Sequence, residues 1–403
     1  MISVAEALAK ILADLPLMPV ETVDLAHARG RVLAEDVVAR VTQPPAHLSA
    51  MDGYAVRAED VVVVPARLKR VGTAPAGGAY DGRLGPGEAV RIFTGGPLPE
   101  GADAIVIQED TEAGGNDDGT VVVLESAPKG RYVRPAGLDF SAGKVGVAAG
   151  RVLGAREIGL AAAMNVPWLA VRRRPRVALL ATGDEIVRPG EPLGPHQIVS
   201  SNALALAALV EAAGGEAIDL GIARDNAESL SAHVAGAAGV DMLVTLGGAS
   251  VGEHDLIREV LGGEGLELEF WQIAMRPGKP LMFGRFGRAA MLGMPGNPVS
   301  SLVCGLLFLR PALRKMLGLP PDEGLRRSAR LGRDLGANDR REDYLRARLE
   351  NGQDGEPVAT PFEKQDSSML SHLVDAQCLV VRPPHAPAAK TGEPVEVIAL
   401  DSL

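Results

Sequence analysis

Residues 176–317 alternate short apolar runs with helix-like segments, and this alternation constrains the fold more than any other feature of the sequence. The apolar runs predict strands at 176–181, 217–220, 241–246, 281–286 and 289–292. The segments between and after them predict helices at 202–213, 227–238, 254–261 and 299–317. Strands joined by helices run parallel, so we expect a central three-layer α/β/α domain with a mainly parallel sheet.

The sequence on either side of this region has a different texture. Ser3 and Glu6 form a capping-box pattern ahead of apolar residues at helical spacing, which predicts an N-terminal helix ending before Pro16. From residue 48 to about 143, valine-rich runs at 61–64, 89–93, 104–108 and 121–124 alternate with glycine and proline. They predict a small β-rich domain, barrel-like or sandwich-like, with a hairpin loop at 112–119. After Pro320 the pattern again favours strands, with candidates at 345, 378–381 and 395–400.

Composition excludes several classes of protein. The 403 residues include 51 acidic and 41 basic side chains, and the net charge of -10 argues against nucleic acid or an anionic membrane as the main partner. Cys304 and Cys378 are too few for a disulfide framework or a cysteine zinc site. The longest uncharged apolar run, 299–309, is too short to cross a bilayer, and the N-terminal stretch lacks a signal-peptide pattern. We therefore expect a cytoplasmic, multidomain protein.

Three loops follow strands of the predicted parallel sheet, at the edge where open sheets bind ligands. They span 182–185, 247–255 and 295–298, and they combine glycines with hydroxyl and carboxylate side chains. Backbone N–H groups of such loops, and the N-terminus of the helix that follows, suit a phosphate or another oxyanion. Ordinary turn chemistry explains any one loop equally well, but the shared position of all three favours a binding site.

Several carboxylates fall in the same strand-end loops, namely Asp184, Glu185, Asp225 and Asp255. Clustered carboxylates without His or Cys favour a hard cation such as Mg²⁺, particularly beside a phosphate. Helix capping is the alternative for Asp225 and Asp255 taken singly. The seven histidines show no metal-ligand spacing, and the sequence has no dinucleotide fingerprint at a strand-to-helix turn, no P-loop and no serine-nucleophile elbow.

Two cations stand in a rigid, proline-rich turn. Arg276 and Lys279 have no acidic neighbour in the sequence, which suits binding of an oxyanion. The arginines between 326 and 348 are interleaved with acids, so composition singles out none of them. Asp52, set among small turn-forming residues, by itself indicates a turn with an Asx interaction. The residues alone thus indicate an enzyme acting on a phosphorylated or oxyanionic ligand, with Mg²⁺.

Six segments occur in an order and at separations that resemble a known family. They are 49–55 (SAMDGYA), 94–103 (TGGPLPEGAD), 181–185 (ATGDE), 221–225 (GIARD), 277–280 (PGKP) and 295–300 (PGNPVS). Together they resemble the MoeA family, which is related to the E domain of gephyrin, and the resemblance runs along the whole chain. With the patterns above it predicts a central α/β domain that binds molybdopterin (1–19 plus 166–321), a linking segment (20–40 plus 143–165), a small β-rich domain (41–142) and a C-terminal β-barrel-like domain (322–403).

The resemblance implies a molybdopterin molybdotransferase that forms a homodimer. In the implied reaction, adenylylated molybdopterin is hydrolysed with Mg²⁺ present while molybdate is inserted into its dithiolene, and AMP leaves. A molybdopterin adenylyltransferase is then the expected upstream partner. Two alternatives are that adenylyltransferase activity itself, although such enzymes are smaller single-domain proteins, and a gephyrin-like scaffold without turnover.

The motif matches also imply roles for individual residues. Those associated with activity in the family are Asp52, Thr94, Asp139, Glu185, Asp225 and Asp255. Of these, Glu185, Asp225 and Asp255 are the candidates for binding metal or substrate phosphate, and Asp52 and Thr94 are expected to complete a cleft formed with the other subunit. Substrate-binding candidates, from the three loops and the motif matches together, are Thr182, Gly183, Gly247, Gly248, Ser250, Arg276, Lys279, Pro295, Gly296, Asn297, Ser300, Arg346 and Ser367. Arg276 stands where the family commonly has lysine, which keeps the charge but changes the donor geometry.

Overall fold

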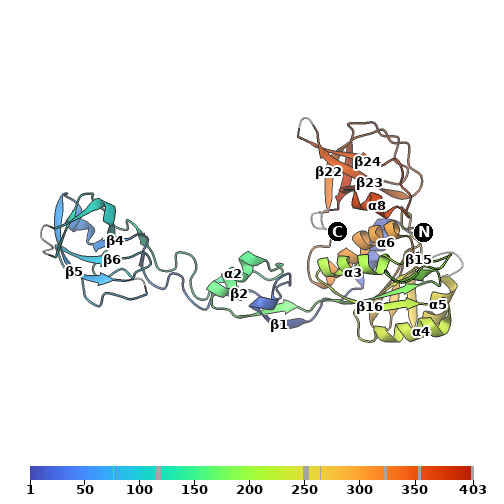
Figure 1. The fold of residues 1–403 in the computed structure, drawn as a ribbon, viewed down its shortest axis with the longest axis horizontal. Helices are drawn as coiled ribbons and strands as arrows, with labels where there is room; N and C mark the ends of the chain where they lie inside the picture. The colour runs from blue at the N-terminus through green and yellow to red at the C-terminus, as the bar shows by residue number, and fades with distance from the viewer. Residues whose placement is uncertain are drawn as a thin grey trace. The chain divides into compact units, whose positions relative to one another are not determined.

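The computed structural model divides the chain into two compact units (Figure 1). The first unit comprises Met1–Glu21, Gly30–Val32 and Val171–Leu403, and the second comprises Thr22–Arg29 and Leu33–Ala170. The structure describes residues 1–75, 77–114, 119–247, 254–263, 265–321, 325–352 and 355–400, and at 254–256 and 258 only the backbone. The four domain boundaries expected from the sequence are finer than this division and stay predictions.

A six-stranded mixed sheet lies at the centre of the first unit, in the order β16-β13-β17-β21-β20-β18. The first four strands in this order are parallel, while β20 is antiparallel to both β21 and β18. Their bounds are β13 Arg176–Thr182, β16 Glu216–Ala223, β17 Met242–Leu246, β18 Leu266–Phe270, β20 Met282–Phe286 and β21 Ala289–Met294. The predicted mainly parallel sheet is therefore confirmed.

Alternate residues of these strands face two different hydrophobic cores. On one face, Val177 and Leu179 of β13 pack with side chains of the N-terminal helix α1 and of α3, α6 and α7. On the other face, Ala178 and Leu180 pack with α4 and α5. This two-residue period is what a sheet covered on both faces requires, and Figure 1 shows α3 and α6 opposite α4 and α5 across the sheet. The three-layer α/β/α prediction is confirmed.

The helices of this unit begin at recognisable signals. The Ser3 hydroxyl accepts a hydrogen bond from the Glu6 backbone N–H at 3.1 Å and caps α1, as the sequence predicts. The predicted helix over 299–317 is interrupted by a π-helical turn, in which the Arg310 N–H donates to the Gly305 carbonyl. Pro311 follows directly, and its lack of an N–H explains why the ordinary bonding pattern changes there. The bounds are α1 Val4–Ala13, α3 Asn202–Ala212, α4 Ala227–Val234, η5 Ala235–Ala237, α5 His254–Gly263, α6 Pro298–Cys304, η6 Gly305–Leu309 and α7 Arg310–Met316.

A closed barrel completes the first unit. Strands β22, β24, β23, β25 and β26 pair in a ring, because β23 bonds to both β24 and β25. One set of residues, including Ala347 and Val380, fills the barrel, while others, including Tyr344 and Leu379, join the core of the central domain. The bounds are β22 Arg326–Leu331, β23 Glu342–Asn351, β24 Pro357–Pro361, α8 Leu370–Val374, β25 Cys378–Arg382 and β26 Pro394–Ala399, with the short strands β14 Ile186–Val187, β15 Ile198–Val199 and β19 Met275–Arg276 elsewhere in the unit.

Both cysteines are free thiols enclosed by this unit. Cys304 lies in α6, where burial raises the pKa of its thiol, and Cys378 lies inside the barrel, where burial raises the pKa to about 12. Both side chains are therefore packed as small apolar groups in the protonated form.

The second unit contains one curled six-stranded sheet in the order β7-β4-β6-β5-β9-β8. Two clusters, one around Val56 and Val106 and one around Ala55 and Ile105, pack on its opposite faces. The bounds in this unit are η1 Leu25–His27, β2 Val37–Val38, β3 Leu48–Ser49, β4 Gly53–Val56, η2 Ala58–Val61, β5 Ala66–Ala74, β6 Glu88–Ile92, β7 Ala104–Ile107, η3 Gln108–Asp110, β8 Thr111–Ala113, β9 Thr120–Val123, β10 Val133–Arg134, β11 Val145–Val147 and α2 Ala155–Ala163. Two further strands, β1 Val20–Asp24 and β12 Trp168–Arg172, each contain residues of both units.

Three of the four strands predicted in this second unit are confirmed, and one is wrong. The runs at 89–93, 104–108 and 121–124 correspond to β6, β7 and β9, whereas the run at 61–64 forms no strand: Val61 ends η2, and Val62 and Val63 are exposed. Pro65, which has no N–H to donate, follows this run directly. The tip of the predicted hairpin loop, 115–118, lies outside the described residues, but β8 and β9 on either side of it pair as expected. In the described parts of the chain, no helix has both the length and the apolar character needed to span a bilayer.

Gly284 provides a test of the central sheet. A Cβ at this position of β20 would lie 2.2 Å from the Glu267 carbonyl oxygen of β18, a backbone atom that cannot move away cheaply. We expect Gly284→Ala to lower the free energy of unfolding of this unit by about 1–3 kcal/mol, because the substitution overpacks a strand contact. The measurement is urea denaturation followed by circular dichroism.

Gly262 in α5 is the matched control, since an added Cβ there meets nothing within 4 Å. Gly262→Ala is expected to raise stability by up to about 1 kcal/mol through helix propensity. Equal denaturation midpoints for the two variants would contradict the described approach of β18 and β20.

Candidate functional site

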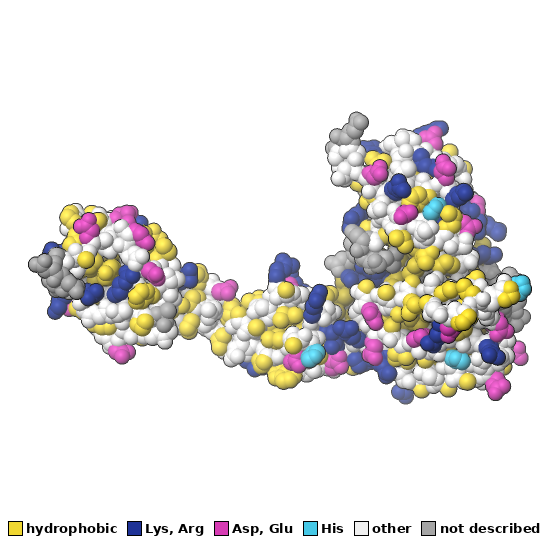
Figure 2. Space-filling model, viewed as in Figure 1, with side chains coloured by type: hydrophobic (Ala, Val, Ile, Leu, Met, Phe, Trp, Pro, Cys, Tyr) yellow, Lys and Arg dark blue, Asp and Glu magenta, His cyan; other side chains and the backbone are white. Residues whose placement is uncertain are grey.

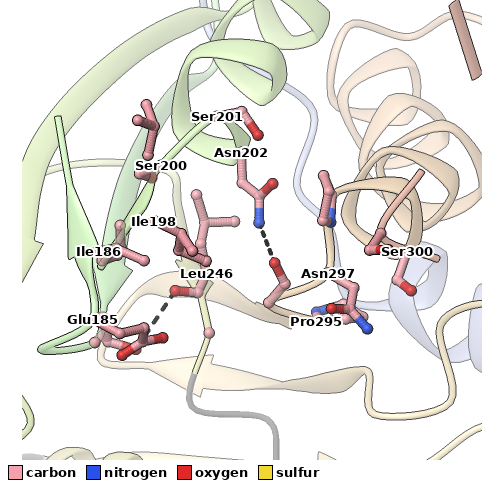
Figure 3. Close-up of a pocket in the computed structure, with 18 of the residues that line it drawn as sticks. Glu185, Ile186, Ile198, Ser200, Ser201, Asn202, Leu246, Pro295, Asn297 and Ser300 are labelled. Atoms are coloured by element: carbon pink, nitrogen blue, oxygen red, sulfur yellow. Dashed lines mark hydrogen bonds between the residues drawn. The ribbon is translucent and has the colours of Figure 1, made fainter. Parts of the chain in front are cut away.

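A cavity of about 580 Å³, with a mixed polar and apolar lining, opens at the carboxyl ends of β13, β17 and β21. The loops that follow these strands supply most of its wall, together with the segment that leads into α3. In Figure 3, Glu185 and Ile186 lie on one side of the cavity, and Asn297 and Ser300 lie on the other. Parallel strands that end at one edge account for this convergence of loops.

Glycine is required where the first two loops meet. Gly247 has φ +96, and a Cβ on it would lie 2.7 Å from the Thr182 carbonyl oxygen. Gly183 has φ +142, and a Cβ there would meet the Glu185 carboxylate at 2.6 Å. Glycine suits the positive φ at both positions, and at Gly247 the two loops pack backbone against backbone.

Two helices begin at the wall of the cavity. Ser201 and Asn202 stand at the start of α3, and the Asn202 side-chain amide donates to the Gly296 carbonyl at 2.6 Å, which joins α3 to the third loop (Figure 3). Asn297 precedes α6, and its side chain makes no capping hydrogen bond; its amide nitrogen donates to the Ser367 hydroxyl at 2.9 Å. Helix N-termini favour negative charge, so this wall suits a phosphate or another oxyanion.

The carboxylates of the site lie on the first loop and on the loop after β16. Glu185 and Asp225 line the cavity and are exposed. The Asp184 N–H donates to Asp225 Oδ2 at 3.3 Å, and the Asp225 N–H donates to Asp184 Oδ1 at 3.4 Å, so these weak reciprocal bonds connect the loops after β13 and β16. The side chain of Asp255, at the start of α5, is outside the described residues, as are Gly248 and Ser250.

A segment of the barrel domain closes one side of the cavity. Ser368 lines it, and the Ser367 carbonyl accepts a hydrogen bond from the Val299 N–H at 3.1 Å. Arg346, which is 1% exposed, holds this segment: its guanidinium donates to the carbonyls of Asp366 and Met369, each at 2.9 Å. Burial lowers the pKa of Arg346 and nearby Asp366 opposes that effect. Arg346 therefore supports the wall from within and does not line the cavity.

The two predicted oxyanion-binding cations have different surroundings. Arg276 is paired with Asp343, to which its Nε donates at 2.9 Å, and with Asp339 at 3.5 Å, and the hydrogen bond to Asp343 raises its pKa. The sequence shows no acid beside Arg276, but folding brings two to it. Lys279 lines a smaller cleft of about 230 Å³ with Met1, Asp339, Arg340 and Arg341, and the neighbouring Pro280 lines the main cavity.

The second unit holds Asp52 and Thr94 together. Asp52 Oδ1 accepts from the Thr94 N–H at 2.6 Å and from the Thr94 hydroxyl at 2.8 Å. These two bonds lower the pKa of the exposed Asp52 carboxyl, with a smaller contribution from the charge of Arg91. The next residue, Gly53, must be glycine because a Cβ there would lie 2.0 Å from the Val106 carbonyl oxygen.

Asp139 lies elsewhere in this unit. It occupies an exposed turn, and its N–H donates to the Gln43 carbonyl at 3.0 Å. Within the described residues no hydrogen bond connects Asp139 with Asp52. The described predicted residues thus fall into the cavity set, the closing segment with Arg346 and Ser367, Arg276 with its acids, Lys279 in its cleft, the Asp52–Thr94 pair and Asp139.

The structure also brings into the cavity residues that sequence reasoning did not select. Ser200, Ser201 and Asn202 line it at the start of α3, and Ile186, Ile198, Val199 and Ser368 form other parts of the wall. A hydroxyl-rich segment directly ahead of a predicted helix was a usable signal for the first three. In contrast, Ile198 and Val199 are largely exposed apolar side chains that only the pairing of β14 with β15 brings to the cavity. On the face shown in Figure 2, charges of both signs are interspersed over both units.

Comparison with protein families matches three regions of the chain. Residues 2–165 match the MoeA N-terminal region (domain I and II), residues 178–315 match a probable molybdopterin binding domain, and residues 328–400 match the MoeA C-terminal region (domain IV). The matched central region contains the loops that form the cavity.

Comparison with individual proteins agrees with these matches. A molybdopterin molybdenumtransferase of Nostoc sp. is 37% identical over 94% of this chain and 88% of its own length, and one of Haemophilus influenzae is 33% identical over 100% of both. Among solved structures, a molybdopterin biosynthesis moeA protein of Pyrococcus horikoshii superposes with a TM-score of 0.86 at 34% identity, covering 99% of both chains.

Thr94 provides a test of the pair in the second unit. We expect Thr94→Val to raise the pKa of Asp52, because it removes the hydroxyl donor to the carboxylate, but to leave it below the ordinary value of 3.8, because the Thr94 N–H remains. The measurement is a carboxyl-carbon NMR titration of the substrate-free protein. A lowered carboxyl pKa stabilises the folded state above about pH 3.8, and this stabilisation is lost as the pH falls through the folded-state pKa. The free energy of unfolding of Thr94→Val should therefore fall less in that pH range than that of the unaltered protein. An unchanged titration would contradict the hydroxyl contact.

Arg346 provides a test of the cavity wall. We expect Arg346→Met to lower the free energy of unfolding by about 2–4 kcal/mol, because it leaves the carbonyls of Asp366 and Met369 without their buried donor. Arg348, two residues along β23, is exposed and stacks on the Phe362 ring at 5.6 Å, so Arg348→Met should cost less than about 1 kcal/mol. Urea denaturation measures both variants, and equal losses would contradict the supporting role of Arg346.

Proposed function

The chain belongs to the MoeA family, and from that membership we infer that it is a molybdopterin molybdenumtransferase, an enzyme of molybdenum cofactor biosynthesis that inserts molybdenum. We propose in addition that its substrates are adenylylated molybdopterin and molybdate, and that AMP leaves as the cofactor forms. The single observation that carries this proposal is the cavity at the carboxyl ends of β13, β17 and β21, inside the region that matches a molybdopterin binding domain.

The cavity has the chemistry that such a substrate needs. Its phosphates are anionic, and the start of α3 presents backbone N–H groups and the hydroxyls of Ser200 and Ser201, while α6 adds Ser300. Ile186, Ile198 and Val199 offer an apolar wall for the flat pterin ring. We propose that these groups bind and orient the substrate, while Arg346 and Ser367 keep the closing segment in place.

Mg²⁺ fits the carboxylates of the cavity. Where Mg²⁺ works beside phosphates, one or two protein carboxylates are sufficient, since water and phosphate oxygens complete its shell. Glu185 and Asp225 would supply that pair. Among the described residues there is no group of three or more His, Cys, Asp or Glu side chains that could hold a metal by itself. When bound, the ion would offset the charge of the phosphates as the anhydride is hydrolysed.

We propose that Asp52 takes part in the reaction. Both hydrogen bonds to its carboxylate go to Oδ1 and lower its pKa, and the exposed side chain is ionised at neutral pH as an ordinary aspartate is. Oδ2 has no hydrogen bond in the described part of the structure, so it is available to orient water or accept a proton. We further propose a cytoplasmic homodimer in which the second unit of one subunit completes the cavity of the partner subunit, with substrate supplied by an adenylyltransferase.

The activity is tested with purified protein, adenylylated molybdopterin, molybdate and Mg²⁺. We expect AMP release that depends on molybdate and on the divalent cation, together with active cofactor. Binding of the pterin without AMP release in the presence of all components would contradict the proposed reaction.

Asp52→Asn tests the role of this carboxylate within that reaction. We expect it to fold normally and to lower the rate of molybdenum insertion roughly 100-fold, because the amide can neither accept a proton nor carry charge. Asp36→Asn is the matched control: Asp36 is also an exposed aspartate that accepts a backbone N–H, from Ala149 at 2.8 Å, and its variant should stay within about twofold of the unaltered protein. Full activity of a folded Asp52→Asn protein would remove Asp52 from the reaction.

A further inference from the structure

Arg91 makes two hydrogen bonds and packs on two aromatic rings. It lies in β6 directly opposite Tyr54 of β4, so the two side chains share one face of the sheet. Its Nη1 donates to the Gly53 carbonyl at 3.2 Å, and its Nη2 donates to Gln108 Oε1 at 2.6 Å. The guanidinium also lies 5.2 Å from the centre of the Tyr54 ring and 5.0 Å from that of Phe93. Two hydrogen bonds and two aromatic faces fix its position.

Three of the residues that Arg91 contacts are connected to Asp52. Gly53, whose carbonyl Arg91 holds, follows Asp52 in the chain. Gln108, the second acceptor, donates its backbone N–H to the Asp52 carbonyl at 3.1 Å. Phe93, against which the guanidinium packs, precedes Thr94, the residue that binds the Asp52 carboxylate. Arg91 thus contacts Gly53, Gln108 and Phe93, and each of these three residues is bonded to or adjacent to Asp52 or Thr94.

We propose that Arg91 is a positioning residue for the molybdenum-insertion reaction, fixing the turn that presents the free oxygen of the Asp52 carboxylate. The inference rests on the role proposed for Asp52. Arg91 does not hydrogen-bond Asp52 itself, so it acts through the backbone of Gly53, the Gln108 side chain and the Phe93 ring. Its charge adds a smaller effect, since it lowers the pKa of Asp52 in the same direction as Thr94 does.

The chemistry of the side chain distinguishes this role from a general need for positive charge. The planar guanidinium donates to two acceptors while its faces stack on rings, whereas the lysine ammonium has neither the fork nor the flat face. Arg91→Lys should therefore keep the charge and lose the fixed geometry. Arg91→Met should lose both and retain only the length of the side chain.

The kinetic test compares full-length variants in the molybdenum-insertion assay. We expect Arg91→Met to lower kcat about 10-fold or more and to change the KM for adenylylated molybdopterin by less than about threefold, because misplacing a reacting group affects turnover more than binding. Arg91→Lys should fall between Arg91→Met and the unaltered protein. Combined with Asp52→Asn, Arg91→Met should cause no further loss beyond about twofold, because the residue it positions is already disabled.

Arg131→Met is the matched control. Arg131 lies in the same unit and also stacks on a tyrosine, at 5.1 Å from the Tyr132 ring, but its side chain donates to Glu125 and Ser126. A substrate-free measurement accompanies the kinetics, namely hydrogen exchange of the Thr94 amide, which donates to Asp52. Arg91→Met should speed that exchange about 10-fold, and Arg131→Met should leave both exchange and kcat within about twofold.

The outcomes separate the two proposals. Full activity of Asp52→Asn overturns the role of Asp52, whatever Arg91 does. If Asp52→Asn is impaired, equal losses caused by Arg91→Met in both backgrounds overturn the positioning role, because Arg91 would then act independently of Asp52. Unchanged Thr94 exchange in Arg91→Met overturns it as well. The positioning role is supported if Arg91→Met lowers kcat only in the protein that retains Asp52 and also speeds exchange of the Thr94 amide.

Discussion

The approach of Gly247 to Thr182 is the contact on which the cavity depends. A side chain at 247 would occupy the space 2.7 Å from the Thr182 carbonyl, so the loops after β13 and β17 can lie together only through a glycine. Their contact puts Glu185 and Gly247 on the cavity wall, which continues in Asp225 of the loop after β16 and in the starts of α3 and α6. The sheet order then adds the third loop beside them, because β21 pairs with β17 in parallel. The position of the polar groups on the cavity wall thus depends on the close approach of the backbones at Gly247 and Thr182.

Much of this arrangement could be predicted because its causes are local in the sequence. Helical and strand periodicities indicated the three-layer domain, and parallel strands end at one edge wherever helices connect them. The loops that carry Thr182, Gly247 and Asn297 were therefore predicted to converge, and in the structure they do. The same reasoning was wrong for 61–64, where a valine-rich run next to a proline has no strand partner.

Other parts of the site depend on contacts between distant residues, which one sequence cannot reveal. Arg276 has no acid nearby in the chain, yet it is paired with Asp343, 67 residues away. Arg346 was one of many arginines among acids, and burial against the carbonyls of Asp366 and Met369 is what distinguishes it. Ile198 and Val199 reach the cavity only because β15 pairs with β14. Pairing over such separations is decided by tertiary packing, which leaves no periodic signal in the sequence.

The burial of the two cysteines has a chemical consequence for an enzyme that handles molybdenum. Cysteine binds a metal through its thiolate, but Cys304 and Cys378 are enclosed and the pKa values of their thiols are raised, so both sulfurs stay protonated and out of reach. The protein offers oxygen and nitrogen donors at its cavity, while the dithiolene of the proposed substrate contributes sulfur. Metal transferred at the cavity therefore meets no competing thiolate from this chain.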